Sequence, residues 1–251
     1  MEFHPQQPWS PQAVEAVARR KEPLALHTEA WQAVANSHAH LQRLQAENRQ
    51  VYGLNTGFGP LATARVTAQA ARDHQRNLIS PLAPGTGEPL PRPQARAVLA
   101  TRILSLAQGY SGIHPASLET LIHCLNRDLI PAIPERGTVG ASGDLTPLAH
   151  LALAVMGEGA MLSDAGSRPA AELLAEQDPA PLAPGGRDAL AIVNGTAAMT
   201  GIAADSVPAA FRALDWAARL AAANAERFCS PAGFLQPGLA RVRPPPGPEW
   251  A

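Results

Sequence analysis

The sequence is short of the residue on which several cofactor chemistries depend. Its 251 residues include a single lysine, Lys21, which lies in a polar run near the amino terminus. Enzymes that use pyridoxal phosphate need a lysine for the Schiff base, and a Walker A loop needs one to reach the phosphates. Lys21 is in neither setting. Both classes are therefore excluded for this chain, unless another chain supplies the lysine.

Other scarcities narrow the class further. The two cysteines, Cys124 and Cys229, are far apart and form neither a disulfide framework nor a zinc cluster. No run approaches the roughly 18 apolar residues of a membrane span, and the start MEFHPQQPWSPQ lacks the basic and apolar regions of a secretory signal. A net charge of −1 offers no basic surface for nucleic acid. We expect a cytoplasmic protein with no membrane or nucleic-acid partner.

Helical periodicity dominates what is present. Apolar residues recur at intervals of three and four, with capping residues, prolines and glycines at the ends of the runs. The pattern predicts helices over about 28–48, 67–79, 93–109, 118–130, 144–157 and 196–228, the last interrupted by Pro208. Strand signals are limited to 51–53 and 190–193, and the stretch 165–187 is typical of a surface loop. The expected fold class is mainly α.

The glycine-rich segment 136–147 carries the most chemical information. A tight turn at Ala141-Ser142-Gly143, followed by Asp144 as a helix cap, is its simplest interpretation. A compressed backbone offers a second one. Attack of the Gly143 nitrogen on the Ala141 carbonyl carbon and loss of water close a five-membered ring, and dehydration of Ser142 then leaves an exocyclic methylidene conjugated to an imidazolone. This electrophile, made from the chain itself, would replace the missing lysine.

In this context the sequence resembles the N-terminal half of the aromatic amino acid ammonia-lyases, the family of histidine, phenylalanine and tyrosine ammonia-lyases. Matching blocks occur in family order over most of residues 20–230: Val51-Tyr-Gly-Leu-Asn-Thr-Gly-Phe-Gly59, Gln75-Arg-Asn-Leu-Ile79, Gly85-Thr-Gly-Glu-Pro-Leu90, Gly137-Thr-Val-Gly-Ala-Ser-Gly-Asp-Leu-Thr-Pro-Leu-Ala149 and Ala189 to Gly201 with Asn194-Gly-Thr. The resemblance implies an ammonia-lyase/fumarase-like helical fold. It also implies the prosthetic group 4-methylidene-imidazol-5-one (MIO), formed from residues 141–143, with no metal and no pyridoxal phosphate.

The resemblance also implies a reaction and roles for residues outside the tripeptide. The reaction is elimination of ammonia from an aromatic L-amino acid, which leaves a cinnamate-type or urocanate-type acid. Tyr52 corresponds to the catalytic tyrosine, which acts as the base for the β-proton. Asn194 corresponds to the asparagine beside MIO and the substrate. Taken without the resemblance, the two would be a loop tyrosine and a turn residue.

Residues 80–84 fall where the family sets its side-chain preference. Histidine lyases resemble Ser-His there, tyrosine lyases His-Leu and phenylalanine lyases Phe-Leu, whereas this chain has Pro81-Leu82. Leu82 cannot hydrogen-bond an imidazole or a phenol, so we expect an apolar or unusual aromatic substrate. Pro81 matches none of the three types. Gly59 and Leu145 complete the predicted substrate contacts.

By the same resemblance, residues 1–190 form the MIO-bearing domain and residues 191–251 begin the central helical bundle. The alanine-rich helix at 196–228 is apolar on most faces, which is typical of a buried helix. The family's second half, with its carboxylate-binding arginine, has no counterpart here. We expect a homo- or hetero-oligomer in which other chains, or a missing C-terminal half, supply it.

Three functions stay open on the sequence. The first is MIO-dependent ammonia elimination in such an assembly. The second is a non-catalytic pseudoenzyme or fragment that keeps the fold, and the third is an aminomutase, which would use the same residues and re-add the ammonia. The dispersed histidines His38, His123 and His150 form no metal motif, and Ser142 lacks the spacing of a serine hydrolase.

Overall fold

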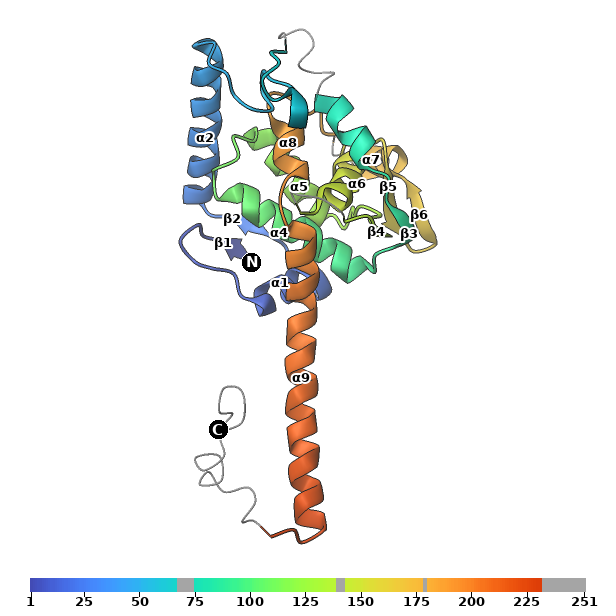
Figure 1. Ribbon diagram of the computed structural model, residues 1–251. Helices are drawn as coiled ribbons and strands as arrows, with labels where there is room; N and C mark the ends of the chain where they lie inside the picture. The colour runs from blue at the N-terminus through green and yellow to red at the C-terminus, as the bar shows by residue number, and fades with distance from the viewer. Residues whose placement is uncertain (67–74, 139–142, 178–179, 232–251) are drawn as a thin grey trace. The chain divides into compact units, whose positions relative to one another are not determined.

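The computed structural model describes residues 1–66, 75–138, 143–177 and 180–231 (Figure 1). Its helices are α1 (Pro11–Arg19), α2 (Thr28–Ala46), α4 (Arg92–Ala107), α5 (Pro115–Asn126), α6 (Leu145–Val155), α7 (Ala170–Gln177), α8 (Asp188–Val193) and α9 (Ala197–Arg227), with 3-10 turns η1 (Gly59–Leu61) and η2 (Ser80–Leu82). The mainly α fold class is therefore confirmed. Of the predicted helix 67–79, residues 67–74 lie outside the described part, and residues 75–79 are helical.

The strands are short and pair only in twos within the described residues. They are β1 (Glu2–Phe3), β2 (Ala25–Leu26), β3 (Thr86–Pro89), β4 (Pro134–Arg136), β5 (Ala160–Ser163) and β6 (Gly166–Pro169). The pair β1–β2 is parallel, whereas β3–β4 and β5–β6 are antiparallel. Strand β6 and helix α7 occupy residues 166–177, about half of the stretch 165–187 that the sequence predicts to be a surface loop, so the prediction is wrong for that half.

Neither of the two strands predicted at residues 51–53 and 190–193 is formed. Residues 52–54 form a turn, and residues 190–193 belong to α8. All six residues of α8 are buried, and the helix packs against α6 and α4. A short, wholly apolar run carries no periodicity, so burial between helices overrides its β-propensity. Helix α9 in turn runs through Pro208 without the predicted interruption.

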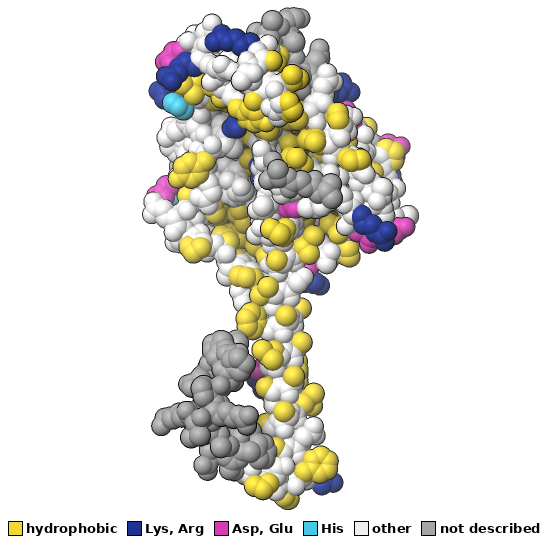
Figure 2. Space-filling model, viewed as in Figure 1, with side chains coloured by type: hydrophobic (Ala, Val, Ile, Leu, Met, Phe, Trp, Pro, Cys, Tyr) yellow, Lys and Arg dark blue, Asp and Glu magenta, His cyan; other side chains and the backbone are white. Residues whose placement is uncertain are grey.

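The chain divides into two compact units, Met1–Pro208 and Ala209–Ala251. The described part of the second unit, residues 209–231, is mostly helical, and its large apolar side chains are exposed: Phe211, Leu214, Trp216, Leu220 and Phe228. Figure 2 shows apolar side chains along this helix. No helix in the described residues is both long and apolar enough to span a membrane.

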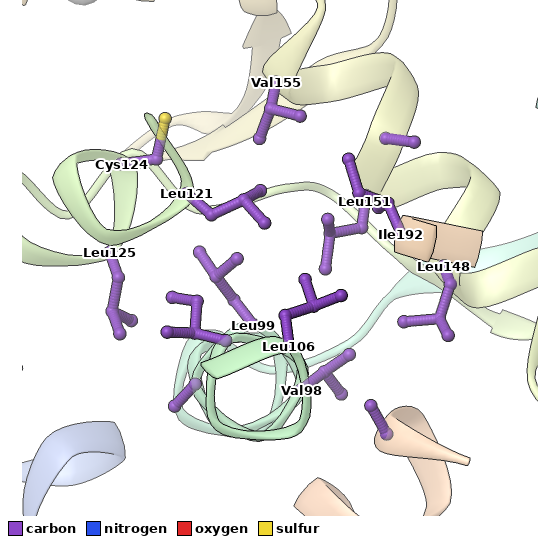
Figure 3. Close-up of a cluster of buried hydrophobic side chains, with 14 of the residues drawn as sticks. Val98, Leu99, Leu106, Leu121, Cys124, Leu125, Leu148, Leu151, Val155 and Ile192 are labelled. Carbon is purple, nitrogen blue, oxygen red and sulfur yellow. The ribbon is translucent and has the colours of Figure 1, made fainter. Parts of the chain in front are cut away.

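The core of the first unit is built around α4, which is buried on nearly every face. Figure 3 shows its side chains among those of α5, α6 and α8; the labelled residues are Val98, Leu99, Leu106, Leu121, Cys124, Leu125, Leu148, Leu151, Val155 and Ile192. Burial of each large aliphatic side chain contributes about 1.5 to 3 kcal/mol. This core holds α6 and α8 together, and the segments that precede α6 and follow α8 carry the candidate site.

Candidate active site

The Tyr52 loop, residues 51–66, is closed by its own backbone. The Gly57 amide donates to the Ala64 carbonyl and the Val66 amide to the Asn55 carbonyl, both at 2.9 Å. The buried Thr56 hydroxyl accepts a hydrogen bond from the Gly53 amide at 3.1 Å. These contacts hold the loop together as one unit.

The Tyr52 side chain lies at the surface of this loop and is 42% exposed, so a small molecule can reach it. Its hydroxyl oxygen accepts a hydrogen bond from the Gly59 amide at 3.2 Å. Its ring meets Phe58 edge-on at a centroid distance of 6.1 Å. The structure thus brings together two of the predicted site residues, Tyr52 and Gly59.

Two side chains from outside the loop hold its backbone at Tyr52 and Gly53. Arg187 Nε donates to the Tyr52 carbonyl oxygen at 3.0 Å. Gln75 Nε2, which is fully buried, donates to the Gly53 carbonyl oxygen at 2.8 Å. The position of Tyr52 is therefore set by residues distant in sequence as well as by the loop itself.

The predicted MIO tripeptide is only partly visible, because Ala141 and Ser142 lie outside the described residues. Gly143 is described, and it pairs with Gly195 in a parallel β-bridge. The next amide, that of Asp144, donates to the Gly195 carbonyl oxygen at 3.0 Å. The end of the tripeptide therefore runs beside the predicted site residue Asn194.

Asp144 was predicted to cap α6, the helix that follows it, but its side chain does not do so. Its buried carboxylate makes no capping hydrogen bond to α6. Instead, Asp144 Oδ2 accepts a hydrogen bond from the Met199 amide at 2.8 Å, in the first turn of α9. The sequence could not indicate this, because local spacing favours the nearer helix. The contact makes Asp144 a second link between the 143–144 segment and the 194–199 segment.

Asn194 is exposed and lies between α8 and α9. It lines a cavity of about 350 Å³ whose polar neighbours are Arg102, Ser105, Tyr110, Ser111, Arg187 and Thr196. Arg102 is almost completely buried there, donates to the Ala191 carbonyl oxygen, and has no partner for Nε among the described residues. Burial lowers the pKa of Arg102 to about 10. The guanidinium still carries its charge at neutral pH, so this cavity has a cationic wall.

The predicted specificity residues lie at α6. Pro81 and Leu82 form the turn η2, which contacts α6, and Leu145 is the first residue of that helix. Leu82 and Leu145 are half-buried and pack against the core. The amide of Gly85 donates to His150 Nε2 at 3.2 Å, and burial lowers the pKa of that imidazole. The substrate-binding role of Pro81, Leu82 and Leu145 stays a prediction.

Three of the remaining histidines contact backbone groups. His27 and His114 accept from the amides of Glu29 and Ala116 and so cap α2 and α5. His38 Nδ1 lies 3.1 Å from the Gly112 carbonyl oxygen. Within the described ranges, no group of three or more His, Cys, Asp or Glu side chains is arranged to hold a metal ion.

Comparison with known proteins gives a consistent result at the level of the family. The family model described as aromatic amino acid lyase matches residues 9–251. The chain is 45% identical over 216 residues to the tyrosine ammonia-lyase of Cereibacter sphaeroides. The match covers 86% of this chain and 41% of that protein. It is 46% identical over 186 residues to the histidine ammonia-lyase of Myxococcus xanthus, covering 74% of this chain and 37% of that protein.

Solved structures agree with these sequences. The phenylalanine aminomutase of Pantoea agglomerans superposes with a TM-score of 0.91 at 27% identity, over 97% of this chain and 47% of that one. The histidine ammonia-lyase of Trypanosoma cruzi gives 0.86 at 30% identity, over 95% and 46%. The predicted ammonia-lyase fold is thereby confirmed, and the chain spans less than half the length of these relatives.

Proposed function

Because the chain belongs to the aromatic amino acid lyase family, we propose that it provides one half of an ammonia-lyase active site. It would supply the MIO group, the base Tyr52 and part of the substrate-binding wall for elimination of ammonia from an aromatic L-amino acid. The observation that carries the proposal is the pairing of Gly143 with Gly195, which joins the MIO tripeptide to the segment of Asn194.

The local backbone at Gly143 fits the tripeptide's proposed cyclisation. Gly143 has φ +84°, a conformation that favours glycine, and a Cβ there would lie 3.0 Å from Thr196 Cγ2 and 3.2 Å from the Gly195 carbonyl oxygen. A glycine is therefore required where the ring-closing nitrogen must be unhindered. The MIO group would supply the electrophile that accepts electrons as ammonia leaves.

A residue of this chain, Tyr52, would remove the β-proton of the substrate. In the proposed reaction Tyr52 Oη takes the β-proton of the substrate, the bond between Cα and the amino nitrogen breaks, and a double bond forms between Cα and Cβ. The Tyr52 residue is exposed, which supports this step, and the hydrogen bond from the Gly59 amide holds the hydroxyl oxygen in place. Asn194, on the cationic cavity, would hydrogen-bond the bound substrate.

We propose that other chains, or a C-terminal half, complete this site and cover residues 209–231. The apolar side chains exposed on that helix, including Trp216 and Leu220, support an interface there. The relatives are more than twice as long as the matched part of this chain, which supports the proposal that a further segment supplies the carboxylate-binding residue.

The substrate proposed from Pro81 and Leu82 is an amino acid with an apolar or unusual aromatic ring. A polar ring would lose its hydrogen-bond partner against Leu82. An aminomutase is the second candidate, favoured by the 0.91 TM-score with the phenylalanine aminomutase. The two differ in product, since a lyase releases an unsaturated acid and ammonia, whereas a mutase yields a β-amino acid.

The test is product analysis with the chain alone and with the C-terminal half of the Cereibacter sphaeroides relative. Incubation with a panel of aromatic L-amino acids is expected to give the unsaturated acid and ammonia in equal amounts. Ser142→Ala and Tyr52→Phe are each expected to abolish that product. A β-amino acid would favour the mutase, and no product with any partner would favour a non-catalytic protein.

A further inference from the structure

We propose that the cavity beside Asn194 is a carboxylate-binding site, filled by an acidic side chain of the segment that completes the active site, with Arg102 as its main ligand. The inference rests on the proposed function, because it needs such a completing segment. No sequence motif indicated Arg102, which lies within helix α4.

The contacts of Arg102 differ from those of the other buried arginine on the same helix. Arg96 is 2% exposed, and its guanidinium donates to backbone carbonyl groups of α1 and α5 and to the Asp128 carboxylate at 2.7 Å. Arg102 is 4% exposed, but its one hydrogen bond within the described chain runs from Nη2 to the Ala191 carbonyl oxygen, and its buried Nε has no partner there. Two guanidinium groups with similar burial are thus unequally satisfied.

The charge of Arg102 lacks a counter-charge in the described part of the chain. Burial lowers the pKa of both arginines of α4, and the charge of Asp128 opposes this effect at Arg96. No described carboxylate opposes it at Arg102, whose pKa is about 10, so the group is still charged at neutral pH. A buried charge without a partner is unfavourable, because the protein around it does not replace the lost water. Arg102 therefore favours an anion that can reach its guanidinium.

The cavity of about 350 Å³ gives an anion that access, and its lining is cationic. Arg187 lines it together with Arg102, and no Asp or Glu is among the described residues around it. The Arg187 guanidinium donates to the backbone carbonyls of Tyr52 and Ser111, which are neutral acceptors. The Ser105 hydroxyl adds a further donor. The set favours a carboxylate, because a guanidinium presents parallel N–H donors that match two carboxylate oxygens.

Two sources of a carboxylate exist in the proposed assembly, the amino acid substrate and an acidic side chain of the completing segment. A substrate occupies the cavity only during turnover and leaves Arg102 unpaired at other times. A side chain stays in place and offsets the burial of the guanidinium permanently. The matches cover only 41% and 37% of the two ammonia-lyase relatives, which are therefore long enough to carry such a residue outside the matched part. These points favour the acidic side chain.

The site is tested first on the chain alone, with acetate as the probe. Acetate carries the carboxylate of an aspartate side chain, and sodium chloride at the same ionic strength controls for screening. We expect acetate to raise the thermal midpoint, followed by circular dichroism, by about 3 °C at ten times its dissociation constant. Arg102→Met should lose this rise, whereas Arg20→Gln, which removes a charge from an exposed pair with Glu22, should keep it. Equal midpoints in acetate and chloride would overturn the site.

A second variant supplies the carboxylate from the chain itself and does not require Arg102→Met to fold. Ser105 is exposed, lines the cavity and lies three positions after Arg102 on α4, so a longer side chain there can reach the guanidinium. Ser105→Glu should raise the thermal midpoint above that of Ser105→Gln, which has the same shape without the charge, and should abolish the acetate effect. Equal midpoints for these two variants would contradict the proposal.

The source of the carboxylate is tested by adding the C-terminal half of the Cereibacter sphaeroides relative. We expect the acetate effect to disappear in the complex, because an acidic side chain then occupies the cavity. Arg102→Met should bind that half at least about tenfold more weakly than the wild type does. An acetate effect that persists in the complex and is displaced by an aromatic amino acid would assign the cavity to the substrate and overturn the acidic side chain.

These measurements require neither MIO nor turnover, which separates the inference from the proposed function. Failure of the two halves to associate would contradict the proposed assembly, while acetate binding to the chain alone would still decide whether the cavity takes a carboxylate. A flat acetate titration would remove Arg102 from the account and leave the product assays with Ser142→Ala untouched.

Discussion

Gly143 and Gly195 lie side by side, and the Asp144 amide fixes the pairing through the Gly195 carbonyl oxygen at 3.0 Å. One of these glycines ends the predicted MIO tripeptide, and the other follows Asn194. The pairing therefore couples the geometry of the two segments on which the proposed chemistry depends. Its stability can be tested without any assay of activity.

Gly195→Ala should destabilise the first unit. Gly195 has φ +153°, and a Cβ there would lie 2.5 Å from Arg102 Nη1, a buried group with little room to move. Strain of this kind costs about 1 to 3 kcal/mol, measurable as the free energy of unfolding in urea. Gly185→Ala is the matched control, because nothing lies within 4 Å of the added carbon. Equal stability of the two variants would contradict the expected clash.

Asp144→Ala should loosen the start of α9. The substitution leaves the Met199 amide without its charged acceptor at 2.8 Å, and loss of such a hydrogen bond costs about 1 to 3 kcal/mol. Asp144→Asn keeps an acceptor oxygen of the same shape and should lose less. Thermal unfolding followed by circular dichroism ranks the variants. An alanine variant as stable as the wild type would show that the cap contributes nothing.

The helices with clear periodicity could be predicted from the sequence, whereas the short elements could not. The predictions for α2, α4 and α6 hold to within a few residues. Strand β6 and helix α7 were missed, because alanine, proline and glycine there resemble a loop locally, whereas pairing with β5 makes residues 166–169 a strand.

The residues of the candidate site were likewise only partly predictable from the sequence. Tyr52 and Asn194 were named from motifs, and their catalytic roles remain predictions. Arg187 and Gln75, which hold the Tyr52 loop, were not predicted to be site residues, because their contacts join residues 135 and 22 positions apart. Such contacts leave no signal in local spacing. The capping of α9 by Asp144 was not predicted for the same reason.

The Asp128 carboxylate should make stability depend on pH at the acidic end. Burial raises the pKa of Asp128, but the Lys21 hydrogen bond and the charges of Arg96 and Arg92 outweigh it, and the pKa is lowered from 3.8. The unfolded chain therefore binds the proton more readily, so this contribution is present above about pH 4 and is lost as pH falls through the folded pKa.

Asp128→Asn removes that contribution. Urea unfolding should show the variant less stable than the wild type at neutral pH, with the gap narrowing near about pH 3. Arg20→Gln, which disrupts an exposed pair, controls for the loss of a surface charge. A gap that is constant with pH would mean that the ion pairs around Asp128 do not titrate as described.

The helix at residues 209–227 should drive self-association of the isolated chain. Its exposed Leu214, Trp216 and Leu220 favour burial against another surface. Leu220→Glu should lower the sedimentation-equilibrium mass, whereas Asn224→Glu adds the same charge without removing an apolar group and should leave it nearly unchanged. A strictly monomeric wild-type chain at high concentration would contradict this expectation.

The central claim is that residues 141–143 cyclise, and the intact mass of the purified 26.3 kDa chain tests it most directly. Loss of two waters would lower the mass by about 36 Da, and peptide mapping should assign the deficit to Ala141-Ser142-Gly143. Ser142→Ala has no side-chain hydroxyl to lose and should lack the deficit of the wild type. An unmodified mass in freshly prepared, assembled protein would contradict the account.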